Sequence, residues 1–258
     1  MELLALPGAR RNAHSAFQAR HQVLRWSVPR RNAMIDIIVP CYNSRPELLA
    51  QCLASIAAQE TQYHMNVWIV DDGSKSPVVA DAAALHPQFG YVFLWPNGGL
   101  PEALNAGHVL GSAKYCCWIS DDNWFEPNFV EEMIGAAEGS GYELVRSLEN
   151  HVDAAGVFTG VTDPRTGTSA LPARELPHDG YLGASHLYRR SIYERTDGYD
   201  PEMAGIEDLD MYYQLMGLGA RVGFVDRSLY NYRVGTSSFS EDRVRSARVK
   251  FMAKWGLK

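Results

Sequence analysis

Four short polar segments of the sequence each follow closely on a run of apolar residues. They are Pro40-Cys41-Tyr42-Asn43, Asp71-Asp72-Gly73-Ser74, Asn97-Gly98-Gly99 and Ser120-Asp121-Asp122-Asn123. Two of them contain adjacent carboxylates, which repel each other unless a cation or hydrogen-bond donors offset the charge. One Asp-Gly turn means little, but acidic pairs in two such places are difficult to explain as turns. These segments are therefore the first candidates for chemistry.

The residue types in these segments favour a nucleotide diphosphate bound with a metal ion. Asp121 and Asp122 offer oxygen ligands to a hard divalent cation such as Mn²⁺ or Mg²⁺, whose coordination phosphate oxygens commonly complete. The Tyr42 ring can stack on a flat ring, and the Asp72 carboxylate can accept hydrogen bonds from a base or ribose. Gly99 permits close approach of the backbone. The sequence has no P-loop and no GxGxxG, which disfavours kinase-like and dinucleotide sites.

Apolar runs and helical segments alternate along the chain. Continuous apolar runs of this length are typical of strands buried on both faces. The first four strands are predicted at 34–40, 66–71, 91–95 and 115–120, and helices at 44–59, 78–85, 100–112 and 127–137. This alternation predicts an α/β fold, a mostly parallel sheet flanked by helices. Ligands bind beyond the carboxyl ends of such strands, so the four polar segments should meet on one rim.

The pattern becomes less regular after about residue 149. Residues 151–180 are rich in Gly, Thr, Pro and Asp and predict a long loop or hairpin of the kind that often shapes a binding site. Strands are expected at 183–188 and 221–225, and helices at 208–218 and 240–255. The chain thus divides into a basic extension, 1–33, and two halves of one domain, 34–150 and 151–258.

Two features concern the ends of predicted elements. Ser44-Arg45-Pro46-Glu47 has the form of a capping box with an early proline, so a helix is expected to begin there. In the extension, a weak helix is predicted from about Ser15 to Trp26 among several arginines. It is interpreted as a helix packed on the domain, or alternatively as an arm for an anionic membrane surface or a partner.

The bulk composition is that of an ordinary globular protein. The 258 residues suffice for one large domain or two small halves. The net charge of −6 argues against nucleic-acid binding by the whole surface. No apolar run approaches the length that spans a bilayer, and the start lacks the charge order of a secretory signal. The four cysteines have no metal-ligand spacing and are interpreted as buried thiols in a reducing cytoplasm.

Six successive motifs resemble those of inverting family 2 glycosyltransferases with the GT-A fold. They are "DIIVPCYN", "VWIVDDGS", "NGGLPEALNAG", "CWISDDNWFEPNFVEEM", "GASHLYRRSIYERTDGYDP" and "GIEDLDMYYQL", in the family's order between Met34 and Arg233. The resemblance implies a hexosyltransferase-like enzyme that depends on a nucleotide sugar and a divalent metal and acts in polysaccharide or glycoconjugate synthesis. It makes residues 34–150 the nucleotide-sugar half and residues 151–258 a smaller, mixed acceptor-side region.

The resemblance also assigns roles to individual residues. It implies that the nucleotide is bordered by Pro40, Tyr42, Asn43, Asp72, Asn97, Gly99 and Asp121. Within this set, Asp72 would hold the base and Asp121 would lie near the ribose. Asp122 takes the position of the metal-binding aspartate, and Asp208 in Glu207-Asp208 takes that of the carboxylate base. The transferred sugar and acceptor would lie beside Gly183, Ala184, Ser185 and Trp124.

Three positions depart from the family's commonest pattern. Ser120 stands where many members have the first aspartate of the metal motif, and Leu104 stands where many have an arginine. Tyr232-Arg233 is followed by Val234 rather than by histidine. These differences put in doubt one acidic ligand, a cationic contact to the nucleotide and a third metal contact.

The residues suit direct displacement, with Asp208 as the general base for an acceptor hydroxyl and a metal that neutralises the leaving diphosphate. Two alternatives remain, a nucleotide-sugar-binding protein without catalysis and a sugar nucleotidyltransferase. The second usually has a basic Gly-rich loop after the first strand, where this chain has only Arg45. Released diphosphate, released pyrophosphate or binding without turnover would separate the three classes.

Several residues also have plain structural interpretations. Asp71 is expected to bond nearby backbone amides, and Asp208 is a possible helix N-cap. Tyr42 is a possible core aromatic, Asp210 is expected to be solvated, and His186 is expected to be packed. For Trp124, core packing and a place facing the sugar are equally compatible with the sequence.

The expected partners are a nucleotide-sugar donor and a glycan, lipid-linked or small-molecule acceptor. A UDP-sugar is the expected donor because uridine diphosphate is the commonest carrier in the family that the motifs resemble. The expected location is the cytoplasm, with peripheral membrane contact through the basic extension as a further hypothesis. Neither the sugar nor the acceptor is named by any residue pattern.

Overall fold

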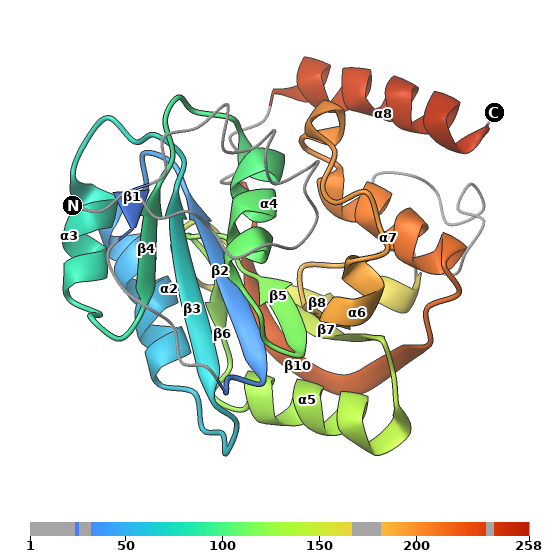
Figure 1. Ribbon diagram of the computed structural model, residues 1–258, viewed down its shortest axis with the longest axis horizontal. Helices are drawn as coiled ribbons and strands as arrows, with labels where there is room; N and C mark the ends of the chain where they lie inside the picture. Colours follow the sequence, from blue (N-terminus) through green and yellow to red (C-terminus); the bar gives the residue numbers. More distant parts are fainter. Residues whose placement is uncertain (1–23, 26–31, 167–181, 236–239, 258) are drawn as a thin grey trace.

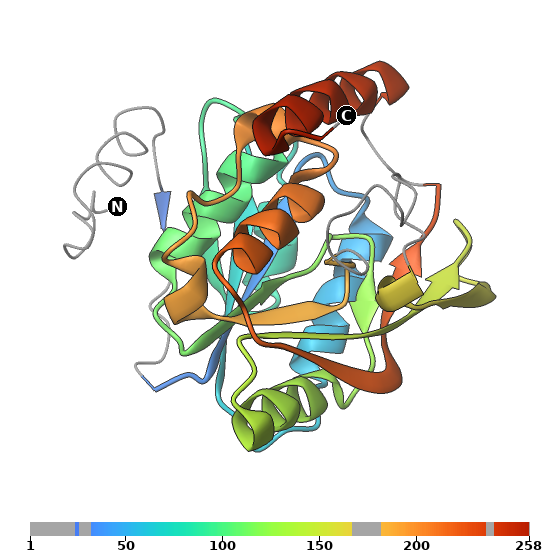
Figure 2. The same cartoon turned by 90° about the vertical axis from the view of Figure 1, so that its right-hand side faces the viewer.

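A computed structural model describes residues 24–25, 32–166, 182–235 and 240–257. One sheet of ten strands is flanked by helices on both faces (Figures 1 and 2). Its strands are β1 Leu24–Arg25, β2 Ile35–Cys41, β3 Met65–Asp71, β4 Gly90–Phe93, β5 Tyr115–Trp118, β6 Trp124–Phe125, β7 Leu144–Val152, β8 Phe158–Thr162, β9 His186–Arg189 and β10 Val222–Arg233. The helices are α2 Pro46–Ala57, α3 Val78–Ala84, α4 Leu100–Leu110, α5 Phe129–Ser140, α6 Arg190–Tyr193, α7 Glu207–Gly217 and α8 Glu241–Trp255, with the 3₁₀ turns η1 Pro164–Thr166 and η3 Pro201–Met203.

The strand order is β1-β4-β3-β2-β5-β9-β7-β10-β6, and β8 pairs with β7 outside this path. Strands β4, β3, β2 and β5 are parallel, and all seven residues of β2 are buried. The predicted parallel sheet is therefore confirmed. Beyond β5 the sheet is mixed, because β9 is antiparallel to β5 and β7 while β10 is parallel to β7. The division into the predicted domain halves stays a prediction.

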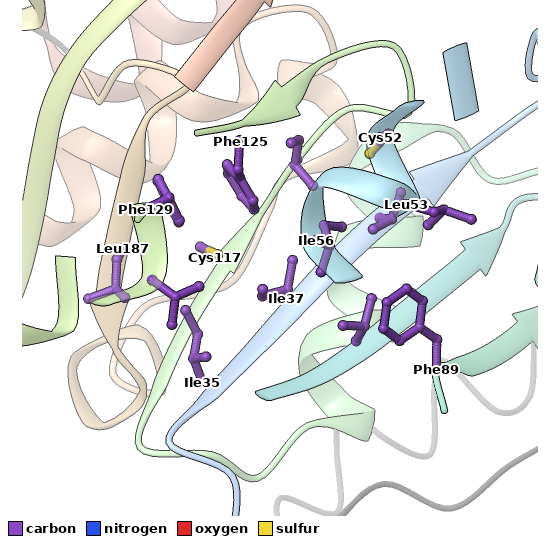
Figure 3. Packing of buried hydrophobic residues seen from close by; sticks show 14 of the residues in the cluster. Ile35, Ile37, Cys52, Leu53, Ile56, Phe89, Cys117, Phe125, Phe129 and Leu187 are labelled. Atoms are coloured by element: carbon purple, nitrogen blue, oxygen red, sulfur yellow. The ribbon is translucent and has the colours of Figure 1, made fainter. Parts of the chain in front are cut away.

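The two faces of the sheet carry separate apolar layers. One layer packs α2, α3 and α5 against Ile35, Ile37 and Cys117. Figure 3 shows part of this layer, with Ile56 of α2 and Phe129 of α5 among the strand residues. The other packs α4, α7 and α8 against strand residues that include Cys116. Adjacent cysteines on a strand point to opposite faces, and all four cysteines are buried and free. The interpretation as buried thiols is confirmed.

Strand β7 was not predicted, although it lies in the middle of the second half of the sheet. Its sequence, LVRSLENHV, interrupts the apolar run with Arg146, Ser147 and Glu149, which are nonetheless 0–5% exposed. These buried polar residues hide the strand from a pattern search. The hairpin expected in 151–180 is formed in part by β7 and β8, and residues 167–181 lie outside the described part of the chain.

Two further predictions about element bounds were wrong. Leu24 and Arg25 pair antiparallel with β4 rather than continuing a helix, and the remainder of the helix predicted at 15–26 lies outside the described residues. Strand β10 runs from Val222 to Arg233, well past residue 225, because register shifts after Val225 let it continue along β7.

A buried ion pair joins the two halves at the start of β2. Asp36 is fully buried. Its carboxylate accepts hydrogen bonds from Arg190 Nη2 at 2.6 Å, the Ala113 amide at 2.7 Å and Asn66 Nδ2 at 3.0 Å. Arg190 also donates to the carbonyl oxygens of Ala113 and His108. The carboxylate and the guanidinium are thus both hydrogen-bonded, which is the condition under which a buried charge is tolerated. In the described part of the chain, no helix is long and apolar enough to cross a membrane.

Candidate active site

The four polar segments meet on one rim of the sheet. The first contacts the second, because the Asn43 amide donates to Ser74 Oγ at 2.9 Å and the Lys75 amide donates to Asn43 Oδ1 at 3.0 Å. The residue after the first segment, Ser44, joins it to the fourth through a short hydrogen bond from Ser44 Oγ to Asp121 Oδ2. The predicted convergence is therefore present, and the parallel register of β2, β3, β4 and β5 is its cause.

Asp72 holds the third segment to the second. Its buried carboxylate accepts hydrogen bonds from the Gly98 amide at 2.8 Å, the Gly99 amide at 2.7 Å and Asn97 Nδ2 at 2.8 Å. Gly99 has φ +87°, a conformation that L side chains rarely adopt. Asp72 thus fixes the shape of the loop before α4, and its contact with a base stays a prediction.

Contacts and burial at the first two strand ends settle two of the structural interpretations. Asp71 accepts a hydrogen bond from the Ser74 amide at 2.9 Å and one from the Tyr91 hydroxyl at 3.0 Å, so its structural role is confirmed. Tyr42 is 47% exposed, which contradicts a place in the core. An exposed ring at the rim remains available for stacking on a base.

The predicted capping box at Ser44 is wrong. Helix α2 begins at Pro46 with Arg45 as its N-cap, and no side chain caps it. The Ser44 hydroxyl donates to Asp121 instead. Burial raises the pKa of Asp121 to about 6; the Ser44 hydrogen bond opposes this shift and the neighbouring charge of Asp122 adds to it. Ser44 thereby offsets part of the repulsion between the two acids.

Arg233 fixes the backbone of the Asp121-Asp122 segment. Its Nε donates to the Asp122 carbonyl oxygen at 3.0 Å, and its amide donates to Asn123 Oδ1 at 2.8 Å. The same guanidinium donates to the Ala154 carbonyl oxygen at 3.0 Å, in the turn between β7 and β8. It also lies 5.2 Å from the centre of the Trp124 ring, which is half-buried. The sequence pattern pointed to this region only because Val234, and not a histidine, follows Tyr232-Arg233.

Glu207 and Asp208 form the first turn of α7. Glu207 accepts the Gly205 amide at 2.6 Å, and Asp208 Oδ1 accepts the Leu209 amide at 2.8 Å. Ile206 is the N-cap residue of this helix, so the interpretation of Asp208 as the cap is wrong. Burial raises the pKa of Asp208, and burial followed by the charge of Asp208 raises the pKa of Glu207 to about 7. Asp208 is the more accessible of the two acids.

Glu149, within β7, is a candidate that the sequence pattern did not reveal. Its Oε1 accepts the Ser185 amide at 3.0 Å, and a Cβ built on Gly183 would lie 2.5 Å from the same atom. Gly183 has φ +76°, so both contacts and conformation require glycine there. A lone carboxylate inside a buried stretch was the available signal. Glu149 therefore shapes the segment from Gly183 to Ser185 that was predicted beside the sugar.

Replacing Glu149 by Gln should change the pH dependence of stability. Burial raises the pKa of Glu149 to about 7, so the folded state binds this proton more tightly than the unfolded chain, and stability falls as pH rises from about 4.5 to about 7. Glu149→Gln keeps the accepting oxygen without the charge. We expect it to stabilise the protein by about 3 kcal/mol at pH 8 and hardly at pH 4, measured by denaturant unfolding. Parallel pH curves for the two proteins would contradict this, and the exposed Glu241→Gln is the control.

The structure also decides the structural interpretations of His186 and Asp210. His186 is fully buried with Nδ1 2.8 Å from the Gly183 carbonyl oxygen, so its packed state is confirmed. Asp210 was expected in solvent but is fully buried, where it accepts Lys254 Nζ and Trp255 Nε1, each at 2.9 Å. The physical reason is that α8, distant in sequence, covers it.

The carboxylates of the rim limit how a divalent metal could be bound. Among the described residues, no group of three or more His, Cys, Asp or Glu side chains is placed to hold an ion. Asp122, half-buried beside Asp121, offers a carboxylate at the rim. Mg²⁺ is often bound by one or two carboxylates with waters and substrate phosphates rather than by a full protein cage. The residues fit that second mode of binding.

The comparisons with known proteins bear on the family and the fold. The model of Glycosyl transferase family 2 matches residues 36–196. An N-acetylglucosaminyltransferase of Bradyrhizobium diazoefficiens is 34% identical over 128 residues, which are 45% of this chain and 26% of the relative. The putative glycosyltransferase EpsH of Bacillus subtilis is 27% identical over 220 residues, which are 79% of this chain and 62% of EpsH.

Solved structures show the same fold at low sequence identity. TarS 1-349 of S. aureus in complex with UDP-GlcNAc has a TM-score of 0.66 and 16% identity, covering 84% of this chain and 66% of that one. Its complex with UDP has a TM-score of 0.65 and 17% identity. The fold is the GT-A fold of glycosyltransferases. Because the family model matches more than half of the chain, this protein belongs to glycosyl transferase family 2. The chain spans between 26% and 62% of the two curated relatives named above.

Proposed function

We propose that this protein transfers a sugar from a UDP-sugar to an acceptor hydroxyl, with inversion and with a divalent metal. The observation that carries the proposal is the meeting of four strand-end segments on one rim, tied by Asp72 and Ser44, in a chain of this family. The related fold of TarS, crystallised with UDP and with UDP-GlcNAc, supports uridine as the base. UDP-GlcNAc is accordingly the first donor to test.

In this proposal the nucleotide lies on the loops after β2, β3 and β4. The exposed Tyr42 ring stacks on the base, with Pro40 and Asn43 beside it. Asn97 and Gly99 line the nucleotide on the loop that Asp72 holds. Asp121, fixed by Ser44, faces the ribose.

Asp122 would hold the metal, with its backbone kept in place by Arg233. When bound, the ion supplies neutralisation of the negative charge that develops on the diphosphate. The acceptor hydroxyl would lie between Asp208 and the segment from Gly183 to Ser185, with Trp124 at the sugar. Asp208 removes the hydroxyl proton as the oxygen attacks the anomeric carbon, and its raised pKa makes it a stronger base. Attack opposite the leaving group inverts the anomeric configuration.

The proposal is tested by product release. The protein is incubated with UDP-GlcNAc and Mn²⁺, with and without a panel of sugar acceptors, and UDP is measured. We expect UDP release that depends on an acceptor and on Mn²⁺ and is lost in Asp122→Asn. Release of pyrophosphate in a parallel incubation with UTP and N-acetylglucosamine 1-phosphate would instead indicate a nucleotidyltransferase. UDP-GlcNAc binding without turnover on every acceptor would indicate a binding protein.

A further inference from the structure

Several carboxyl groups lie near the place where the proposed function puts the diphosphate. Burial raises the pKa of Tyr232, and the charges of Asp208, Asp122 and Glu207 add to this shift, so these acids lie within electrostatic reach of one side chain. Asp121 adjoins Asp122, and a diphosphate adds further negative charge. A cationic side chain beside the diphosphate would offset part of that repulsion. Helix α4, which begins at the rim, has no Lys or Arg in its sequence, and its Leu104 is fully buried in an apolar cluster. Any protein cation must therefore come from another element.

Arg243, in the first turn of α8, reaches the rim from the far end of the chain. A Cβ built on Gly99 would lie 3.8 Å from Arg243 Nη2. The same arginine charge acts on Glu207, where it lowers the pKa against the larger effect of burial. The Arg243 guanidinium therefore lies close to the loop before α4. It is also close enough to the start of α7 to influence the pKa of Glu207. The Arg243 residue is exposed, so a ligand on the rim can reach it.

Helix α8 is anchored firmly enough to place this arginine. Ser240 Oγ caps the helix by accepting the Arg243 amide at 3.3 Å. Ala247 and Phe251 are buried against the layer that contains α4 and α7. At the other end, Lys254 and Trp255 both donate to the buried Asp210 of α7. Figures 1 and 2 show that α8 lies on the same side of the molecule as α7. The end of α4 that is closest to α8 lies on this side too.

We propose that Arg243 binds the diphosphate of the nucleotide sugar and stabilises it as the leaving group. A guanidinium presents a planar fork of N–H donors that matches two phosphate oxygens, and such charge-assisted bonds are among the strong hydrogen bonds of proteins. In this position Arg243 lies beside the loop at Gly98-Gly99, so the guanidinium and the loop can contact the same phosphate group. This inference rests on the proposed function and adds to it a specific phosphate contact from α8.

The test compares Arg243→Gln with Arg245→Gln. Both variants remove one arginine charge from α8, but Arg245 is 74% exposed and lies 3.8 Å from Asp242 on the same helix. Binding of UDP and of uridine is measured by calorimetry at fixed Mn²⁺. We expect Arg243→Gln to weaken UDP binding about tenfold or more and to leave uridine binding unchanged, while Arg245→Gln leaves both unchanged. Arg243→Lys should recover part of the loss because it restores the charge without the fork.

Three outcomes would overturn the role of Arg243, the third together with the proposed function. Equal UDP affinity of the two glutamine variants would overturn the role of Arg243 and leave the proposed function standing. Equal weakening of UDP and uridine by Arg243→Gln would also overturn it, because a phosphate contact cannot act on the nucleoside. Absence of UDP binding by the unaltered protein, with uridine also unbound, would overturn the proposed function and this inference together. Thermal unfolding of each variant confirms that it is folded.

Discussion

Asp208→Asn is expected to lower sugar transfer by about 10²–10⁴-fold, the usual contribution of a general base, while UDP-GlcNAc still binds. The amide keeps the shape of the side chain and can still accept the hydrogen bond of the Leu209 amide through its oxygen. It cannot take the proton of the acceptor hydroxyl. The measurements are UDP release with acceptor and, separately, calorimetric binding of UDP-GlcNAc.

The matched control for this variant is Glu202→Gln. Glu202 lies in the 3₁₀ turn just before α7 and has a side chain that is 66% exposed and paired with Lys250. The Glu202→Gln variant also loses one carboxylate close to α7. Because Glu202 has no role in the proposed reaction, this variant should retain full transfer. Wild-type turnover by Asp208→Asn would remove the proposed role of Asp208. A loss of turnover that is accompanied by lost UDP-GlcNAc binding would assign Asp208 to donor binding rather than to proton transfer.

Asp36→Ala is expected to destabilise the fold by about 3–5 kcal/mol, the usual consequence of removing one partner of a buried ion pair. The substitution leaves the Arg190 guanidinium and the Ala113 amide without their shared acceptor. For a chain of this size the melting temperature should fall by roughly 6–20 °C. Thermal and urea unfolding measure the change.

The comparison variants for Asp36 separate the ion pair from simple loss of charge. Asp226→Ala removes a carboxylate that is 79% exposed and lies 3.3 Å from Arg165, so it should change stability by less than about 1 kcal/mol. The double variant Asp36→Ala with Arg190→Met should be less destabilised than the sum of the single variants, because it removes both charges. An additive double variant would contradict direct coupling of the two residues.

The local pattern of the sequence was sufficient for the first half of the sheet. Buried parallel strands appear as continuous apolar runs, and β2 is such a run, so its position and the rim beyond it could be predicted. The positions of Asp72, Asp121 and Asp122 at strand ends followed from the same periodicity. Family membership likewise follows from the order of the motifs, and the match to residues 36–196 confirms it.

The local pattern of the sequence was not sufficient for the second half of the sheet. Strand β7 has polar residues at buried positions, and each is acceptable only because a neighbour supplies a partner, as the Ser185 amide does for Glu149. Asp210 appeared to be a solvent-facing acid, yet Lys254 and Trp255 enclose it. No local pattern could show this, because the partners lie more than 40 residues away.

The sequence by itself determined the fold class, the family and the residue types that face the rim. These properties depend on short-range periodicity and on motifs that need no partner. Only the tertiary structure decided what each polar side chain does: Ser44 bonds Asp121 instead of capping α2, Arg233 holds the Asp122 backbone, and α8 brings Arg243 close to Gly99. The physical reason is that a charge or a hydroxyl acts on whatever folding brings within a few ångströms, and such neighbours are set by the packing of distant elements.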